Sequence, residues 1–309
     1  MITVTGATGN IGRTLVDLLT EAGEEVVAVS RQPRQASSAV LAVPGAPGVS
    51  GTPGTSGASD TPGVRWAEGH VGDAASMRAP LTGARALFIV LGGELNAFGE
   101  SPELLLRAAV DAGVERVVLV SSQVSATRPE AASHARLREF EAAVRASGLD
   151  STILRPGGFA SNAFAWADTI RTKRTVFAPF ADVALPVVDP ADIAAVAAKA
   201  LRPVRGDGSG GRRGRVYELT GPEPISPRQQ AAVISAALGE EVTFVELSRA
   251  EAHAAMARFM PEEAVAGTLD VLGAPLPEES RVSTDVATVL GRPAGAFAGW
   301  ARRNLAAFR

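Results

Sequence analysis

The amino-terminal segment Met1–Arg13 carries the pattern that most constrains this chain. Two β-forming residues, Ile2 and Val4, stand at alternate positions at its start. Glycines then recur at every third position: Gly6, Gly9 and Gly12. Apolar residues follow at helical spacing: Ile11, Leu15, Leu18 and Leu19. This order predicts a buried strand, a tight turn and the start of a helix.

The glycine turn is typical of a cradle for phosphate groups. Residues without a Cβ atom accept positive φ angles and let the backbone approach a pyrophosphate closely. The new helix directs free N–H groups and a partial positive charge at such an anion. A second strand over Glu25–Ser30 completes the context that a dinucleotide site requires, although a structural turn in another α/β protein is the alternative. The expected cofactor contacts in the turn are Gly6, Thr8, Gly9, Asn10, Ile11 and Gly12.

Two strings resemble the extended and atypical short-chain dehydrogenase/reductase families, and the NmrA-like group in particular. The first is T-G-A-T-G-N-I-G, beginning at Thr5, and the second is T-x-L-R-P-G-x-F-x-x-N, from Thr152 to Asn162. A D-x-x-D-I segment at Asp189–Ile193 is a further match. The resemblance implies an α/β fold, namely a Rossmann-type doubly wound parallel sheet with a small C-terminal substrate lobe.

The length of 309 residues suits one large α/β unit with a smaller appended lobe. We expect residues 1–154 to form the NAD(P)-binding Rossmann domain and residues 155–309 to form mainly the substrate-binding lobe. Residues 185–201, read as a strand followed by a helix, and 216–220 are expected to return to the sheet. Residues 44–63 are rich in Gly, Pro, Ser and Thr, which predicts a flexible surface insertion or a lid over the cofactor.

Composition excludes several classes of function. The net charge of -3 and the pI near 5.8 give no general attraction to nucleic acid or to a membrane surface. Zero cysteines exclude disulfides and thiolate chemistry, and three scattered histidines predict no metal site. Strand residues follow Met1 directly, so we expect no signal peptide and a cytoplasmic protein. We further expect a monomer or homodimer that acts on a small molecule.

The residues after the second strand favour NADP(H) over NAD(H). An NAD site usually has an acidic residue there to bind the ribose hydroxyls. This chain has Ser30, Arg31 and Arg34 instead. A hydroxyl and a guanidinium suit a 2′-phosphate that a carboxylate would repel, whereas the alternative is that Arg31 is an ordinary solvated loop cation.

Further cofactor contacts are expected where later strands end. The segment with His70 and Val71 resembles the G-D-x-x-D segment of NmrA-like proteins, in which the first acid and the next residue contact the adenine. Here His70 replaces that acid and could donate a hydrogen bond to the adenine. The alternative is that His70 is a histidine packed at a strand end. The other expected contacts lie at the carboxyl ends of three strands, where open α/β sheets bind ligands. They are Leu91, Gly92, Gly93, Ser121, Pro156 and Gly157.

The catalytic pattern departs from that of the tyrosine-dependent short-chain dehydrogenases, which have a serine followed by Tyr-x-x-x-Lys. On that pattern Ser122 matches the serine, His134 falls at the tyrosine and Arg138 at the lysine. The single tyrosine, Tyr217, lies far downstream. A histidine can donate a proton near neutral pH, and the nearby arginine favours its neutral form. The alternative is that both residues occupy the wet face of a helix over residues 131–146.

The segment after Gly157 predicts a substrate pocket lined by Gly158, Phe159, Asn162, Phe164 and Trp166, or else aromatic residues of an ordinary core. The sequence therefore predicts an NADPH-dependent atypical short-chain reductase that transfers hydride to a small apolar quinone, enone, imine or carbonyl compound. The alternatives are a non-catalytic NADP(H)-sensing regulator of the NmrA type and a non-redox isomerase or cyclase.

Overall fold

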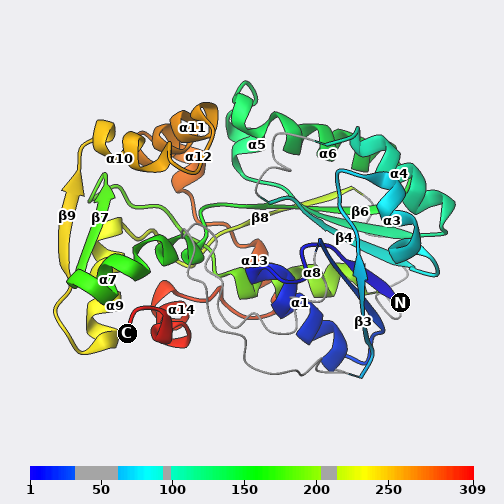
Figure 1. Cartoon of the computed structure of the whole chain (residues 1–309), viewed down its shortest axis with the longest axis horizontal. Coiled ribbons are helices and arrows are strands. Elements are labelled where there is room, and N and C mark those ends of the chain that lie inside the picture. The colour runs from blue at the N-terminus through cyan, green and yellow to red at the C-terminus, as the bar shows by residue number, and fades with distance from the viewer. Residues whose placement is uncertain (32–61, 93–98, 203–213) are drawn as a thin grey trace.

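The computed structural model describes residues 1–31, 62–92, 99–202 and 214–309. It has a larger body built on a central sheet and a smaller lobe beside the carboxyl ends of the strands (Figure 1). The expected positions Arg34 and Gly93, and residues 44–61 of the expected insertion, lie outside the described residues.

Within the described residues, seven strands form one sheet in the order β3-β2-β1-β4-β5-β6-β8. All of their pairings are parallel, and β1 lies between β2 and β4, with Val4 opposite both Ala28 and Phe88. This topology confirms the predicted doubly wound α/β fold. The strands are β1 (Ile2–Val4), β2 (Val26–Ser30), β3 (Val64–Glu68), β4 (Ala86–Val90), β5 (Arg116–Val120), β6 (Asp150–Pro156) and β8 (Arg215–Leu219).

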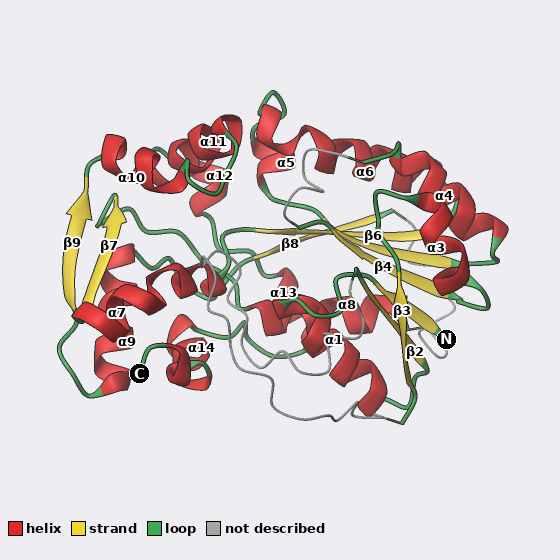
Figure 2. Ribbon diagram, in the orientation of Figure 1, coloured by secondary structure: helices red, strands yellow, loops and turns green. Residues whose placement is uncertain are grey.

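Helices cover both faces of the sheet, as Figure 2 shows. One face carries α1 (Asn10–Glu21), α8 (Pro190–Leu201) and α13 (Asp285–Leu290). The other face carries α3 (Ala74–Leu81), α4 (Pro102–Asp111) and α6 (Ala135–Ala146). Neighbouring residues of β4 divide between the two cores, Phe88 facing the first and Leu87 the second. Burial on both faces explains why β4 is a continuous apolar run in the sequence.

The smaller lobe contains a parallel pair of strands, β7 (Thr175–Pro179) and β9 (Thr243–Leu247). Its aromatic core includes Trp300 and Phe308. Ser226 caps α9 (Pro227–Leu238) through a reciprocal capping box with Gln229. The lobe helices are α7 (Ala167–Lys173), α9 (Pro227–Leu238), α10 (Arg249–Met256), α11 (Glu262–Gly273), α12 (Pro277–Ser280) and α14 (Phe297–Arg303).

Two local predictions were wrong. Residues 185–188 do not form a regular strand but make single bridges, Leu185 to Ile225 and Val188 to Phe159, because Pro186 has no N–H to donate to a ladder. The helix expected from residue 131 begins at Ala135, after a 3₁₀ turn over Ala132–His134.

Two absences hold for the part of the chain that the structure describes. None of its helices is long and apolar enough to cross a membrane. Its His, Cys, Asp and Glu side chains form no group of three or more that is suited to a metal ion.

Candidate functional site

The crevice at the carboxyl edge of the sheet lies where the strand order changes direction. Chain segments after β1 run toward β2 and β3, whereas β4, β5 and β6 extend to the other side of β1. Thr5 holds this point together, because its hydroxyl donates to the carbonyl of Phe88 (2.9 Å) and accepts from the N–H of Val90 (3.1 Å). Ligands of open α/β sheets bind at such a switch point.

The glycine turn after β1 has the geometry that a phosphate cradle needs. Gly6 has a φ of 61°, and the N–H of Gly9 donates to its carbonyl at 2.9 Å. A Cβ atom at Gly12 would lie 2.1 Å from the oxygen of Gly6, so only glycine lets α1 pack this closely on the turn.

The first turn of α1 suits a bound anion. Gly9 is the N-cap residue and supplies no side-chain hydrogen bond, and the first turn contains no acidic residue. The turn is open to solvent at Gly6, Thr8, Gly9 and Asn10, whereas Ile11 faces the first core. Main-chain N–H groups at the end of this helix therefore fit a pyrophosphate, and Ile11 serves the packing.

The cofactor-specificity positions follow β2. Ser30 ends the strand and is half-buried, and Arg31 is exposed beside it. On the neighbouring strand end, His70 is half-buried and its backbone belongs to the turn that starts α3, where its N–H donates to Ser76 Oγ at 3.0 Å. Val71 is buried in the second core, so it has only its backbone to offer a ligand.

The segments after β5 and β6 lie side by side. The N–H of Ser121 donates to the carbonyl of Leu154 (2.7 Å), and the N–H of Gln123 donates to that of Pro156 (2.9 Å). Gly157 donates in turn to Leu219 of β8 (3.0 Å). Backbone hydrogen bonds at the carboxyl end of β6 and just beyond β5 and β6 thus place three of the predicted contacts, Ser121, Pro156 and Gly157, at one edge of the sheet. After β4, Leu91 is half-buried and Gly92 exposed, with open space where a Cβ of Gly92 would project.

His134 precedes α6 instead of lying within it, so it and Arg138 do not share a regular helical face. Nδ1 of His134 lies 2.9 Å from Ser133 Oγ, and Arg138 Nη1 donates to the carbonyl of Ala131 at 2.9 Å. Burial lowers the pKa of His134 below its ordinary value, the charge of Arg138 lowers it further, and the Glu279 carboxylate opposes both effects. The imidazole is therefore held in its neutral form near pH 7.

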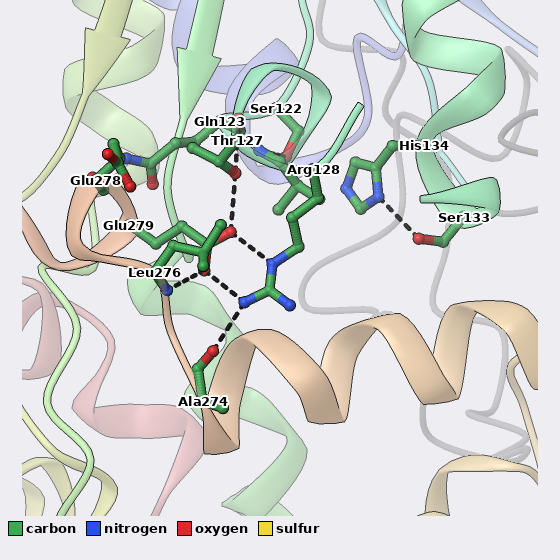
Figure 3. Close-up of polar contacts among 11 residues, drawn as sticks. Ser122, Gln123, Thr127, Arg128, Ser133, His134, Ala274, Leu276, Glu278 and Glu279 are labelled. Atoms are coloured by element: carbon green, nitrogen blue, oxygen red, sulfur yellow. Dashed lines mark hydrogen bonds and ion pairs between the residues drawn. The ribbon is translucent and has the colours of Figure 1, made fainter. Parts of the chain in front are cut away.

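Ser122 makes a local contact at the start of α5 (Val124–Thr127), where its hydroxyl accepts the N–H of Val124 at 3.2 Å. Among the described residues no hydrogen bond joins Ser122 to His134, and Figure 3 shows them on separate segments. The serine-to-histidine contact that a proton relay would use is thus absent from this arrangement.

A cluster of ion pairs and hydrogen bonds that sequence reasoning missed joins α5 to the lobe (Figure 3). The Glu279 side chain, 2% exposed, accepts from Arg128 Nε and Nη2, both at 2.8 Å, and from the Thr127 hydroxyl at 2.8 Å. Gln123 Nε2 donates to the carbonyl of Glu278 at 2.8 Å. The partners are about 150 positions apart, so no local pattern connects them.

The expected pocket residues do not gather in one place. Phe164 packs on Trp300 with ring centroids 4.9 Å apart, and Trp166 belongs to the same lobe core. Phe159 packs against the first core, while Asn162 is exposed. Gly158 links the sheet to the segment before α8, because its carbonyl accepts the N–H of Val188 at 2.8 Å.

A Rossmann-type sheet with a glycine turn, an uncapped helix end and a lobe across the strand ends defines a class of nucleotide-binding α/β proteins. The sequence model of the NmrA-like family matches residues 1–270. The chain belongs to the NmrA-like family, which confirms the family resemblance.

Two curated relatives and one solved structure illustrate this kinship. A (4-alkanoyl-5-oxo-2,5-dihydrofuran-3-yl)methyl phosphate reductase from Streptomyces griseus is 34% identical, covering 100% of this chain and 99% of that protein. An NAD(P)H azoreductase from Xenophilus azovorans is 30% identical over the same shares. An NADPH-dependent quinone oxidoreductase from Escherichia coli, solved with NADPH, has a TM-score of 0.74 at 24% identity and covers 98% of this chain and 99% of its own; it shares the fold.

Proposed function

We propose that this protein is an NADPH-dependent reductase that transfers hydride to a small apolar quinone, enone, imine or carbonyl compound. The observation that carries the proposal is the glycine turn, where a Cβ at Gly12 would clash with the Gly6 carbonyl beside a helix end with no side-chain cap. The two curated relatives, both reductases by name, support the same class of reaction.

The residues present fit NADP(H). In the proposal the N–H groups of the first turn of α1 hold the pyrophosphate, and Arg31 binds the 2′-phosphate beside Ser30. Ser121, Pro156 and Gly157 form the wall at the nicotinamide end. When bound, the reduced nicotinamide would supply the hydride for the reaction.

His134 is the proposed proton donor to the reduced acceptor. Its neutral imidazole has one N–H, and Ser133 Oγ, 2.9 Å from Nδ1, fixes the orientation of the ring. In this role the acceptor gains hydride and one proton: the neutral imidazole of His134 takes up a proton from solvent, and the imidazolium that forms gives this proton to the acceptor and returns to the neutral form. Arg138 contributes charge that disfavours the imidazolium form between turnovers.

The test is stopped-flow oxidation of NADPH by a panel of quinones, enones, imines and carbonyl compounds, run with wild type and His134→Ala. We expect turnover of at least one acceptor class and a slower rate in the variant by roughly 10²-fold, the contribution typical of a positioned acid. A variant as fast as wild type would remove the role of His134 and leave the reductase proposal standing. NADPH binding without oxidation of any acceptor would contradict the reductase proposal.

One observation favours a second function, an NADP(H)-sensing regulator. Tyr217, the single tyrosine, lies in β8 opposite Leu154, so it does not stand at the position, occupied by His134, where the tyrosine-dependent short-chain dehydrogenases have theirs. The same titration separates the two functions, because a sensor binds NADP(H) and oxidises none of the panel.

A further inference from the structure

A buried carboxylate outside the proposed site holds two of its edges together. Glu141 lies on α6 and its side chain is 3% exposed. Its Oε1 accepts from the Ser121 hydroxyl at 2.7 Å and from Arg155 Nε at 2.9 Å. Its Oε2 accepts from Arg155 Nη2 at 2.6 Å and from Arg145 Nη2 at 2.9 Å. A buried carboxylate is stable only with such a full set of donors.

The donors come from the places where the site is built. Ser121 directly follows β5, and Arg155 is the penultimate residue of β6, which ends at Pro156. One carboxylate, on α6, thus fixes two segments relative to each other, namely Ser121–Gln123 after β5 and Pro156–Gly157 at the end of β6. Arg145 differs, because its side chain is 45% exposed and lies one helical turn along α6.

The Ser121 hydroxyl uses its hydrogen to bond this carboxylate. Ser121 is 5% exposed, its Oγ donates to Glu141, and it lies 3.2 Å from Ser125 Oγ. Burial raises the pKa of the Glu141 carboxyl, but hydrogen bonds from Arg155 and Ser121 outweigh it and keep that pKa below its ordinary value. The carboxylate therefore stays ionised and remains an acceptor over the neutral range.

We propose that Glu141 is a positioning residue for the dinucleotide site: through Ser121 and the Arg155 fork it sets the spacing of the two strand ends that line the nicotinamide end. This inference rests on the proposed NADP(H) site. Its physical basis is that misplacement of a binding wall by a fraction of an ångström costs binding free energy without unfolding the protein.

The experiment measures the Kd for NADPH and the melting temperature of five proteins: wild type, Ser121→Ala, Arg155→Lys, the double variant of these two, and Arg145→Met. Ser121→Ala removes one donor, and Arg155→Lys keeps the charge but loses the two-pronged contact. Arg145→Met is the matched control, because it removes an ion pair to the same carboxylate on its exposed side. Glu141→Gln is avoided as the sole variant, since an amide beside two arginines endangers folding.

We expect Ser121→Ala and Arg155→Lys each to raise the Kd for NADPH about fivefold, roughly 1 kcal/mol of binding free energy, while Arg145→Met leaves it unchanged. The double variant Ser121→Ala/Arg155→Lys should add little, because both changes break one network. An unchanged Kd in Ser121→Ala overturns the inference. A higher Kd in Ser121→Ala but not in Arg155→Lys also overturns it, because this result would mean that Ser121 contacts NADPH directly. An equal rise of the Kd in Arg145→Met overturns it as well. Failure of wild type to bind NADPH would instead refute the proposed function.

Discussion

A Cβ atom added to Gly12 of α1 would lie 2.1 Å from the carbonyl oxygen of Gly6 in the turn that precedes the helix. Gly12 is buried, so a side chain at this position has no solvent-filled space to enter and would push α1 away from the turn. This contact ties the packing of the fold to the shape of the proposed phosphate cradle.

Gly12→Ala should therefore destabilise the protein by about 1–3 kcal/mol, as overpacking does, and abolish binding of NADPH. Gly299→Ala is the matched control, since its Cβ would make only an ordinary contact at 3.5 Å with Arg303 in the middle of α14. Urea denaturation and NADPH titration of both variants provide the measurement. Normal binding by Gly12→Ala would contradict the assignment of this turn.

Arg31→Ala should weaken NADPH binding about tenfold, close to 1.4 kcal/mol, and leave NADH binding unchanged. The reason is that only NADPH carries the 2′-phosphate that the guanidinium is proposed to meet. Arg65→Ala removes an exposed arginine near the amino end of β3, opposite Val27 and away from the carboxyl ends of the strands. It is expected to affect the binding of neither cofactor. Equal losses for NADPH and NADH in Arg31→Ala would refute the phosphate contact.

The lowered pKa of His134 predicts a loss of stability in mild acid. The unfolded chain binds a proton at the ordinary value of 6.5 while the folded protein does not, so the free energy of unfolding falls as the pH falls from 6.5 toward the lowered pKa. Below that lowered pKa the loss is complete, and above 6.5 the stability contribution is fully present. Urea denaturation between about pH 7.5 and pH 5.5 should show this loss in wild type and less of it in His134→Gln. An imidazole titrating by NMR at or above its ordinary pKa would contradict this account.

Arg128→Met should destabilise the protein by roughly 3 kcal/mol, because it leaves the buried Glu279 carboxylate without its main partner. Arg281→Met is the control: its pair with Glu218 is exposed, and little change is expected. Chemical denaturation of both variants gives the comparison. Equal stability of the two variants would show that the contacts between α5 and α12 contribute little.

Much of the architecture could be predicted because its signals are local. The alternation at Ile2 and Val4, the glycine turn after them and the start of the helix that follows each depend on a few neighbouring residues, and the structure has the strand and the helix there. Predictions were poorer where distant contacts decide the outcome. Pro186 interrupts the strand expected before α8, and the segment Ala132–His134 turns as a 3₁₀ helix where the lobe helix α11 packs against it.

The sequence by itself determined the strand-turn-helix unit, because strand propensity, glycine conformation and helix periodicity are properties of neighbouring residues. The family and the parallel sheet followed from the resemblance that two short motif strings carry. Tertiary structure alone decided which charges are buried and paired. Glu141 with Ser121 and Arg155, and Glu279 with Arg128, come together only when separate elements pack, and burial then requires each carboxylate to find a donor.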